Sequence, residues 1–329
     1  MSLDFNEIKN YADFFNRRII EHFNEIEPEI LKKFSLHILV NGGKRLRPFI
    51  LSKIANFYGM DFESSFPASA SVELIHNFSL IHDDIMDKDK IRHGKPTVHE
   101  AYGLDFAILS GDLLFALAFK SLQMLKGKVK KDRILKSYNE LSSATVKLAI
   151  GQGLDIHLSR NKIFDQNKTI KMIQYKTSAL FEASCVIGAL ISNAKMKEVE
   201  KIRKFARYSG IAFQIKDDIL GTFGDEKITG KPVGNDLREG KKTLIVIHAF
   251  NHGNSLLKNK LEKVLGNPLA SNDDIKSLID DLKTIGSYDY AMEKSKYYLN
   301  LAKRHLEDLR KDLADFLYSF GEFLVERNY

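Results

Sequence analysis

The chain has 329 residues, of which 44% are hydrophobic and only six are proline, so a large core is possible and an intrinsically disordered chain is excluded. Its formal net charge of +7 suits anionic partners. The lysines and arginines are scattered, without an arginine-rich arm or an aromatic-basic repeat, so no nucleic-acid partner is expected.

Patterns with the helical period dominate from the first residues onward. Apolar side chains at Ile8, Tyr11, Phe15 and Ile19 predict an amphipathic N-terminal helix. Further helices are predicted over about 49–57, 72–85, 104–126, 132–158, 169–192, 197–220, 241–253, 255–265, 272–284 and 287–326. Alternating strand patterns are scarce, and no glycine-rich βαβ start is present. The sequence therefore predicts an all-α helical bundle in one domain that spans residues 1–329.

Cysteine usage and hydropathy indicate the compartment. Cys185 is the only cysteine and lies in an apolar run, which predicts a buried thiol and excludes an internal disulfide. The N-terminus shows no signal peptide, so a reducing cytoplasm is expected. The most apolar stretch, Phe106 to Phe119, is interrupted by Asp112 and is shorter than the roughly 20 residues of a membrane span. No transmembrane segment is expected.

A basic segment, Gly42-Gly43-Lys44-Arg45-Leu46-Arg47-Pro48, precedes the helix predicted over 49–57. Lysine presents a compact ammonium group, and arginine presents a planar fork that fits phosphate oxygens. The two glycines allow the backbone to bend, and proline suits the first turn of the following helix. Three cations within four residues predict an anion site.

An aspartate-rich segment, Asp83-Asp84-Ile85-Met86-Asp87, follows apolar residues at the end of another predicted helix. Asp83 and Asp87 are four residues apart and share a face, whereas Asp84 points about 100° away. Carboxylates at this spacing repel, and a hard cation such as Mg²⁺ reverses the sign by binding them together with substrate phosphates. A solvated acidic helix end is the simpler alternative.

A second pair, Asp217-Asp218, follows the apolar residues 211–215 and precedes an irregular, glycine-rich segment at about 221–240. Gln214 lies three residues before Asp217 and can share its face. The glycine-rich segment contains Lys231, and Lys241 follows it. A helix end that leads into a charged surface loop is the alternative. With the first cluster, this pair predicts a cavity that holds divalent cations and phosphates.

Taken together, these residues resemble the trans-isoprenyl diphosphate synthases. The resemblance runs from about Gly42 to Lys242, and its further markers are His76, Arg92, Gly111-Asp112, Gly151-Gln152, Asp155 and Lys176-Thr177. It implies an all-α bundle around a deep central cavity and usually a homodimer. Phe106–Phe119 and the helices within residues 4–40 are candidates for dimer packing.

The resemblance implies roles for the matching residues. The site for isopentenyl diphosphate is implied at Lys44, Arg47, His76 and His93. Ligands of three Mg²⁺ ions are implied at Asp83, Asp84, Asp87, Asp217 and Asp218. Contacts to the allylic diphosphate are implied for Arg92, Lys176, Thr177, Gln214, Lys231 and Lys241. The catalytic set among these is Asp83, Asp87, Asp217, Lys176 and Arg92.

Two positions depart from the family pattern. Many relatives carry two arginines after the first aspartate segment, whereas this chain has Arg92-His93, so the second contact is expected to be weaker or pH-dependent. Gly221 stands where relatives with a full second DDxxD have an aspartate. More of the third ion's coordination is then left to water and diphosphate.

The reaction implied is the head-to-tail condensation of isopentenyl diphosphate with allylic diphosphates through an allylic carbocation. Product length is expected to depend on Phe78 and Ser79, which lie five and four residues before Asp83. One aromatic residue with a small neighbour resembles the archaeal-type geranylgeranyl diphosphate synthases. A C20 product with some C15 farnesyl diphosphate is therefore expected, and a C15-specific or longer-chain synthase is the alternative.

Two other classes of protein are disfavoured. A class I terpene cyclase normally has a different second metal motif and lacks the element of Lys44 and Arg47. A non-catalytic subunit of a heteromeric synthase tends to lose motif aspartates or the basic cluster, and both are largely intact here. The substitution Asp83→Ala separates an enzyme from a non-catalytic subunit, because it abolishes turnover in an enzyme and leaves a scaffold role untouched.

Overall fold

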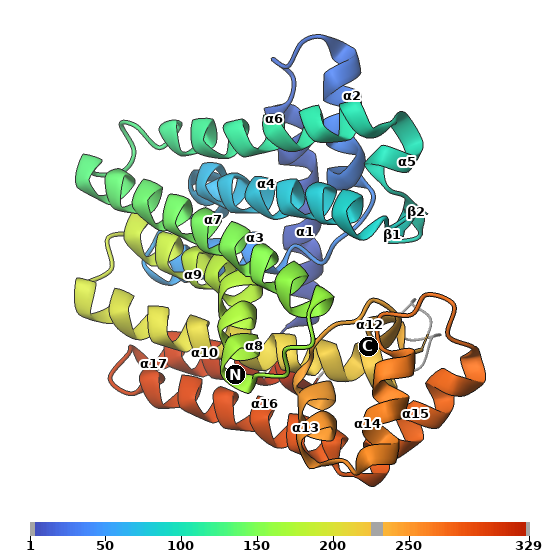
Figure 1. Ribbon diagram of the computed structural model, residues 1–329. Helices are drawn as coiled ribbons and strands as arrows, with labels where there is room; N and C mark the ends of the chain where they lie inside the picture. The colour runs from blue at the N-terminus through green and yellow to red at the C-terminus, as the bar shows by residue number, and fades with distance from the viewer. Residues whose placement is uncertain (1–3, 225–232, 327–329) are drawn as a thin grey trace. The chain divides into compact units, whose positions relative to one another are not determined.

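The computed structural model describes residues 4–224 and 233–326, which are predominantly helical (Figure 1). The prediction of an all-α fold is confirmed. The chain divides into two compact units, namely residues 2–145 with 183–203 (the N-terminal unit) and residues 146–182 with 204–329 (the C-terminal unit). The assignment of one domain to residues 1–329 stays a prediction.

The N-terminal unit contains six complete helices and a small hairpin within its described residues. These are α1 (Phe5–His22), α2 (Glu29–Val40), α3 (Leu46–Phe57), α4 (Phe62–Asp87), β1 (Ile91–Arg92), β2 (Lys95–Pro96), α5 (Val98–Tyr102) and α6 (Leu104–Gln123). It also includes the first half of α7 (Lys131–Arg160), the end of α9 (Ala179–Ile191) and the start of α10 (Met196–Phe223).

Helix α4 is the central helix of this unit and packs chiefly against α6 and α3. Its first half is lined by small buried residues, which allow neighbouring helices to approach closely. Ser52 of α3 is hydrogen-bonded to Ser69 and Ser65 of α4 at 2.7 and 2.8 Å, and the Tyr11 hydroxyl donates to the Pro48 carbonyl at 2.9 Å. Because these buried hydroxyls are hydrogen-bonded to one another and to the Pro48 carbonyl, α1, α3 and α4 pack together without leaving these hydroxyls unpaired.

The C-terminal unit begins with the second half of α7 and continues through a run of shorter helices. These are α8 (Gln166–Ile173), η1 (Gln174–Ser178), the start of α9, the rest of α10, α12 (Asn235–Arg238), α13 (Leu244–His252), α14 (Ser255–Val264), α15 (Asn272–Thr284), α16 (Ser287–Lys303), η2 (Arg304–Leu306) and α17 (Lys311–Glu326).

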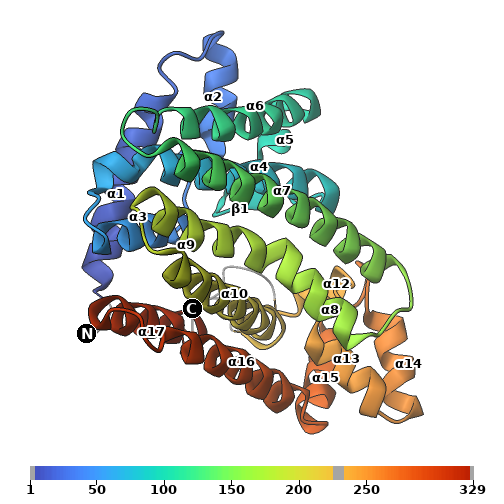
Figure 2. The ribbon, with the colours of Figure 1, turned by 90° about the vertical axis from the view of Figure 1, so that its left-hand side faces the viewer.

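The core of this unit forms around α10, whose Ile211, Ile215 and Ile219 repeat every four residues and pack with apolar residues of α13, α14 and α15. Figure 2 shows α16 alongside α17, and α16 is tied to α10 because the Ser295 hydroxyl donates to the Ala212 carbonyl at 2.9 Å. Asp217 lies near the C-terminal end of α10, between the core residues Ile215 and Ile219.

The predicted helices differ from the observed ones mainly at interruptions. The helix predicted over 169–192 is divided by a π-helical turn, and the one predicted over 287–326 is broken after Lys303. Helix α13 starts at Leu244 because the Thr243 side chain caps it by accepting from the Val246 backbone nitrogen. Among the described helices, none combines the length and the apolar character that a membrane crossing requires.

Candidate active site

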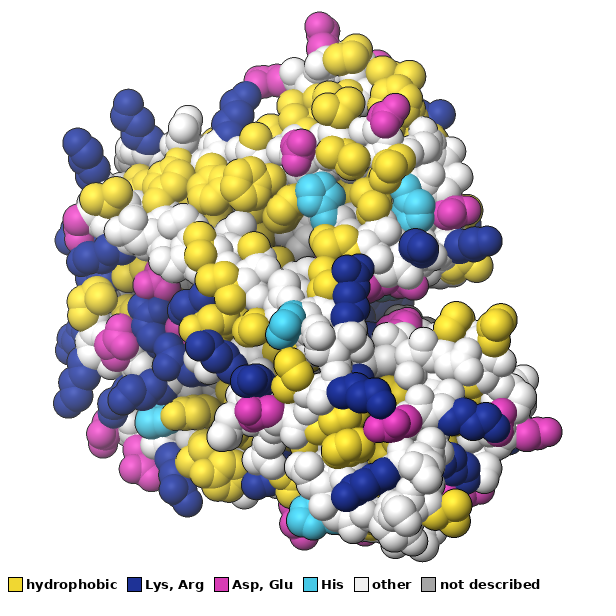
Figure 3. All heavy atoms as spheres, in the orientation of Figure 1, with side chains coloured by type: hydrophobic (Ala, Val, Ile, Leu, Met, Phe, Trp, Pro, Cys, Tyr) yellow, Lys and Arg dark blue, Asp and Glu magenta, His cyan; other side chains and the backbone are white. Residues whose placement is uncertain are grey.

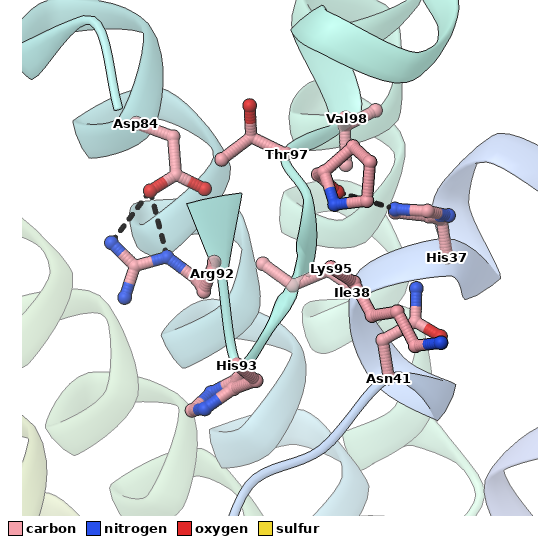
Figure 4. Close-up of a pocket in the computed structure, with 10 residues that line it drawn as sticks. His37, Ile38, Asn41, Asp84, Arg92, His93, Lys95, Thr97 and Val98 are labelled. Atoms are coloured by element: carbon pink, nitrogen blue, oxygen red, sulfur yellow. Dashed lines mark hydrogen bonds and ion pairs between the residues drawn. The ribbon is translucent and has the colours of Figure 1, made fainter. Parts of the chain in front are cut away.

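The first aspartate segment forms the C-terminal end of α4. Asp83 is half-buried and Asp87 is exposed, whereas the side chain of Asp84 is only 2% exposed and points to a different side of the helix. Asp84 Oδ1 accepts a hydrogen bond from Arg92 Nε at 2.7 Å and lies 2.6 Å from Arg92 Nη2 (Figure 4). Burial raises the pKa of the Asp84 carboxyl, and the adjacent guanidinium opposes this rise. Asp84 thus holds Arg92 in place.

Arg92 and His93 lie on a hairpin that the sequence pattern did not predict. Strands β1 and β2 pair antiparallel, with Arg92 opposite Lys95, and the two turn residues His93 and Gly94 have φ of 52° and 73°. Positive φ at both positions is typical of a type I′ turn. The signal for this turn in the sequence was Gly94, because a type I′ turn favours glycine at its second central position.

The hairpin is anchored by His37 of α2, which sequence analysis missed. His37 Nε2 donates to the Pro96 carbonyl at 2.8 Å (Figure 4). The Tyr102 hydroxyl lies 3.2 Å from His37 Nδ1. Because a carbonyl oxygen only accepts, the Nε2 atom of His37 carries a proton in this contact. No local pattern around residue 37 indicates this long-range contact.

The structure brings together the four residues predicted to bind isopentenyl diphosphate. A pocket of about 130 Å³ in the N-terminal unit is lined by the segment 42–47 and by residues of α4 and the hairpin, including Lys44, Arg47, His76 and His93. A Cβ on Gly42 would lie 3.0 Å from the His93 Cβ, and the φ of Gly42 is 137°. Glycine is needed there because the backbone is unusual and His93 packs close against it.

Arg45 also borders this pocket, but its guanidinium group is engaged in the core. Its side chain is 2% exposed, and its Nη1 donates to the buried Glu73 carboxylate at 2.8 Å. Its Nε donates to Asn16 at 2.8 Å. The sequence predicted an anion site from three neighbouring cations, whereas the structure places the guanidinium of Arg45 in the core, where it fixes the bend that carries Lys44 and Arg47.

His76 is neutral in this environment. Arg47 Nη1 donates to His76 Nε2 at 3.3 Å, which leaves the imidazole proton on Nδ1. Burial lowers the pKa of His76 well below its usual 6.5, and the charges of Arg47 and Arg92 lower it further. A bound anion would reverse this electrostatic effect.

Lys176 and Thr177 lie in the C-terminal unit on the π-helical turn η1, a structure often found at functional sites. Lys176 Nζ contacts Asp155 Oδ2 of α7 at 2.6 Å. A Cβ on Gly151 would lie 2.3 Å from the Lys176 backbone nitrogen, so α7 can approach η1 only with glycine at that position. The sequence identified Gly151 and Asp155 as family markers, and the structure supplies their contacts.

The second aspartate pair is linked to η1 by hydrogen bonds. Thr177 Oγ1 donates to Gln214 Oε1 at 2.7 Å, and Gln214 Nε2 donates to Asp218 Oδ1 at 2.8 Å. Burial and the nearby Asp236 carboxylate raise the pKa of Asp218 well above its usual value. Asp217 is half-buried. Asp218, like Asp84 in the first segment, therefore has a protein partner on the buried side.

Lys241 is near the second aspartate pair and is held by carboxylates. Its Nζ lies 2.8 Å from Asp236 Oδ1 and 2.6 Å from Glu239 Oε2. Burial opposes its charge, but these two carboxylates raise the pKa of Lys241 well above its usual value. A Cβ on Gly221 would lie 2.3 Å from Asp236 Oδ2, so glycine makes room for that carboxylate. Lys231 lies outside the described residues.

The aspartates fit a metal ion that arrives with a phosphate. Within residues 4–224 and 233–326, no group of three or more His, Cys, Asp or Glu side chains could hold a metal ion. Mg²⁺ commonly takes only one or two carboxylates and completes its shell with water and substrate phosphate oxygens. Asp83 with Asp87, and Asp217, match that pattern, whereas a structural site made by protein ligands alone does not fit these residues.

Phe78 is fixed in an aromatic cluster of α4 and α6. Its ring centroid lies 4.8 Å from that of His82 and 5.3 Å from that of Phe115. Ser79 is buried, and its hydroxyl donates to the His76 carbonyl at 2.8 Å. A Cβ on Gly111 would lie 2.3 Å from His82 Nε2, so that glycine gives room for the cluster. The Phe78 ring therefore packs between His82 of its own helix and Phe115 of α6.

Comparisons with known proteins identify the family of this chain. The family model described as polyprenyl synthetase matches residues 28–282. The chain is 42% identical to a geranylgeranyl diphosphate synthase of Sulfolobus acidocaldarius, over 90% of this chain and 88% of the relative. It is 40% identical to a short chain isoprenyl diphosphate synthase of Methanocaldococcus jannaschii, over 98% and 93%. A solved geranylgeranyl pyrophosphate synthetase from Pyrococcus horikoshii superposes with a TM-score of 0.90, at 38% identity and 98% coverage of each chain.

Proposed function

This chain belongs to the polyprenyl synthetase family and is a prenyltransferase, and from that premise we propose that it makes mainly geranylgeranyl diphosphate (C20), with some farnesyl diphosphate (C15). The reaction is the head-to-tail condensation of isopentenyl diphosphate with allylic diphosphates. The observation that carries the proposal is a basic pocket in the same unit as Asp83 and Asp87. One site binds phosphate by cations, and the other binds it through metal-compatible carboxylates.

Isopentenyl diphosphate occupies the basic pocket in this proposal. Lys44 and Arg47 bind its phosphate oxygens, because an ammonium group and a guanidinium fork suit that geometry. His76 and His93 complete the lining. This substrate does not ionise in the reaction, so a pocket made by cations alone is sufficient to hold and orient it.

The allylic diphosphate is bound through the aspartates and the η1 residues. Asp83, Asp87 and Asp217 would hold the Mg²⁺ ions, three in number, which would neutralise charge on the leaving diphosphate; Asp84 and Asp218 lie on the buried side of each cluster. Arg92, Lys176, Thr177, Gln214 and Lys231 contact the same group. Lys241 joins them by exchanging a contact to Asp236 or Glu239 for the diphosphate.

In the proposed reaction one C–O bond breaks and one C–C bond forms. The allylic C–O bond breaks and its electron pair stays on the diphosphate oxygen, which Arg92 and Lys176 stabilise electrostatically. The double bond of isopentenyl diphosphate supplies the pair for the new C–C bond. The proton that is then lost goes to the departed diphosphate. No protein nucleophile is needed, and an apolar surrounding excludes the water that would quench the cation.

Phe78 sets the product length. It lies about 7.5 Å before Asp83 along the axis of α4, and its ring is braced by Phe115 and His82. Ser79, one residue closer to the aspartates, is too small to stop the growing chain. We therefore expect elongation to continue past Ser79 and to end at the aromatic ring.

The enzyme acts as a homodimer in this proposal, and α6 supplies much of the interface. Leu104, Ile108, Leu109 and Phe115 of α6 are 51%, 42%, 51% and 38% exposed. Figure 3 shows hydrophobic side chains gathered over this part of the N-terminal unit. A contiguous apolar surface of this kind is typical of a protein interface. The buried lone thiol of Cys185 supports action in the reducing cytoplasm.

The test is to incubate the purified protein with Mg²⁺, isopentenyl diphosphate and each allylic diphosphate in turn, and to measure the chain length of the products. A C20 main product is expected. A main product of C25 or longer would keep the family and overturn the role of Phe78. Absence of condensation with every starter, from folded protein, would overturn the function.

A matched control separates catalysis from contamination. Asp83→Ala removes a half-buried carboxylate that the proposal makes essential, and it should abolish turnover. Glu21→Ala removes an exposed carboxylate of α1 and should leave turnover unchanged. Equal activity of both variants would show that the product came from another enzyme.

A further inference from the structure

Helix α7 carries a buried side chain that none of the preceding roles uses. Gln152 is 6% exposed, and among the residues that the structure describes neither its Oε1 nor its Nε2 has a hydrogen-bond partner. A buried amide with both ends unpaired is unfavourable, and native structures keep such groups for a reason. Because no group within residues 4–224 and 233–326 pairs with these two atoms, a bound substrate is the partner that we consider for them.

The surroundings of Gln152 identify the place. The adjacent Gly151 lies against the backbone of Lys176, and Asp155, three residues further on, binds the Lys176 ammonium at 2.6 Å. Four residues earlier, Leu148 is buried. Leu148, Gln152 and Asp155 have the spacing of one helical face. Along that face the character changes from apolar, through neutral polar, to charged.

An allylic diphosphate has the same order of groups, from its apolar tail through the allylic carbons to the diphosphate. Gln152 and Asp155 are about 4.5 Å apart along the helix axis. With Lys176 at the diphosphate end and Leu148 at the tail, Gln152 lies level with the reacting carbons. We infer that Gln152 is a further catalytic residue, whose amide oxygen faces the allylic carbons and stabilises the positive charge that develops on them, an inference that rests on the proposed function.

The chemistry favours an amide over the other polar groups nearby. When the C–O bond breaks, the electron pair stays on the diphosphate and positive charge is shared by two allylic carbons. The negative end of a fixed amide dipole stabilises that charge in a site without water. The amide forms no covalent bond and transfers no proton, so the bonds broken and formed in the condensation stay the same. A carboxylate at this position would instead capture the cation as an ester.

Neighbouring polar side chains are already engaged. Thr177 is bonded to Gln214, Gln214 to Asp218, and Asp155 to Lys176. The Gln152 amide has no such bond, so it can turn its oxygen to the substrate without breaking an existing contact.

The test uses two variants and a matched pair of probes. Gln152→Met keeps the length of the side chain and removes both polar atoms, and Gln152→Glu keeps an acceptor oxygen and removes the donor. The probes are 2-(dimethylamino)ethyl diphosphate, which has a protonated nitrogen at the third atom of the chain, and its uncharged-chain counterpart 3-methylbutyl diphosphate. Binding of each is measured by calorimetry with Mg²⁺, and condensation is followed in a single turnover.

We expect Gln152→Met to weaken the ammonium probe by at least tenfold, with less than a threefold change for 3-methylbutyl diphosphate. The single-turnover rate should fall by roughly 10²-fold, the effect of removing one group that stabilises transition-state charge. Gln152→Glu should bind the ammonium probe at least as tightly as the wild type.

Two outcomes overturn the inference. Equal weakening of both probes by both variants would make Gln152 a donor to the diphosphate, and a change in melting temperature alone would make it structural. Ser35→Ala is the control, because Ser35 of α2 is also buried with no hydrogen-bond partner for its hydroxyl, and it should alter neither probe nor rate. Wild-type turnover in the same assay shows separately whether the proposed function holds.

Discussion

Replacing Gly151 by alanine tests whether the close approach of α7 to η1 positions Lys176. The new Cβ would lie 2.3 Å from the Lys176 backbone nitrogen and 2.7 Å from its Cα. Backbone atoms cannot rotate away as a flexible side chain would. The two elements must therefore separate, or the π-helical turn must rearrange.

The size of the effect follows from the contact. An ordinary van der Waals separation is about 3.5 Å, so the elements must move apart by roughly 1 Å. Overpacking of this kind costs about 1–3 kcal/mol of stability. A displacement of about 1 Å in a catalytic group can reduce the rate about 100-fold. The 2.6 Å contact between Lys176 and Asp155 should be lost at the same time.

Gly153→Ala is a matched control on the same helix. A Cβ at Gly153 would meet nothing within 4 Å, so this substitution should stabilise the helix by about 0.5–1 kcal/mol without changing the rate. Both variants are compared by denaturant unfolding and by steady-state condensation. If Gly151→Ala matches Gly153→Ala in stability and rate, the close approach of α7 to η1 does not position the site.

Three further predictions concern the N-terminal unit. Asp84→Asn should lower the free energy of unfolding by about 2 kcal/mol, which is less than the loss of a fully buried ion pair because the Arg92 side chain is 23% exposed. The same substitution should raise the KM for the allylic diphosphate, and an unchanged KM would contradict the positioning role of Asp84. The pKa of His76 is lowered well below 6.5 in the folded protein, so the unfolded chain binds the proton more readily. The stability that His76 contributes is therefore present above pH 6.5 and is lost as the pH falls below that value. His76→Gln should remove this loss, measured by unfolding without ligand over a range of pH. Phe78→Ala should shift the main product from C20 to C25 or longer, measured by chromatography of the dephosphorylated products, and a retained C20 product would place the stop elsewhere.

Helix positions and motif residues could be predicted because they depend on short-range patterns. The residues of α4 and α10 follow the helical period, and the aspartates at their ends have fixed spacing, so the face of each carboxylate follows from geometry. The family resemblance supplied the pocket of Lys44, Arg47, His76 and His93, and the structure places all four around one cavity.

Several features could not be predicted because distant contacts decide them. Arg45 has the same chemistry as Arg47, but Glu73 and Asn16 draw it into the core. His37 is indistinguishable in sequence from a surface histidine, yet it holds the hairpin through the Pro96 carbonyl. A side chain's partner in another helix leaves no periodic signal in its own segment.

Local patterns predicted the all-α fold, because apolar periodicity specifies helices, and paired carboxylates with clustered cations indicated a site for metal ions and phosphates. Tertiary packing sets which polar groups have partners. It pairs Asp84 with Arg92 and Asp218 with Gln214, and it leaves the Gln152 amide on α7 without a partner within residues 4–224 and 233–326. The physical reason is desolvation: whether a buried polar group is satisfied depends on atoms brought near it by packing, and local sequence does not contain that information.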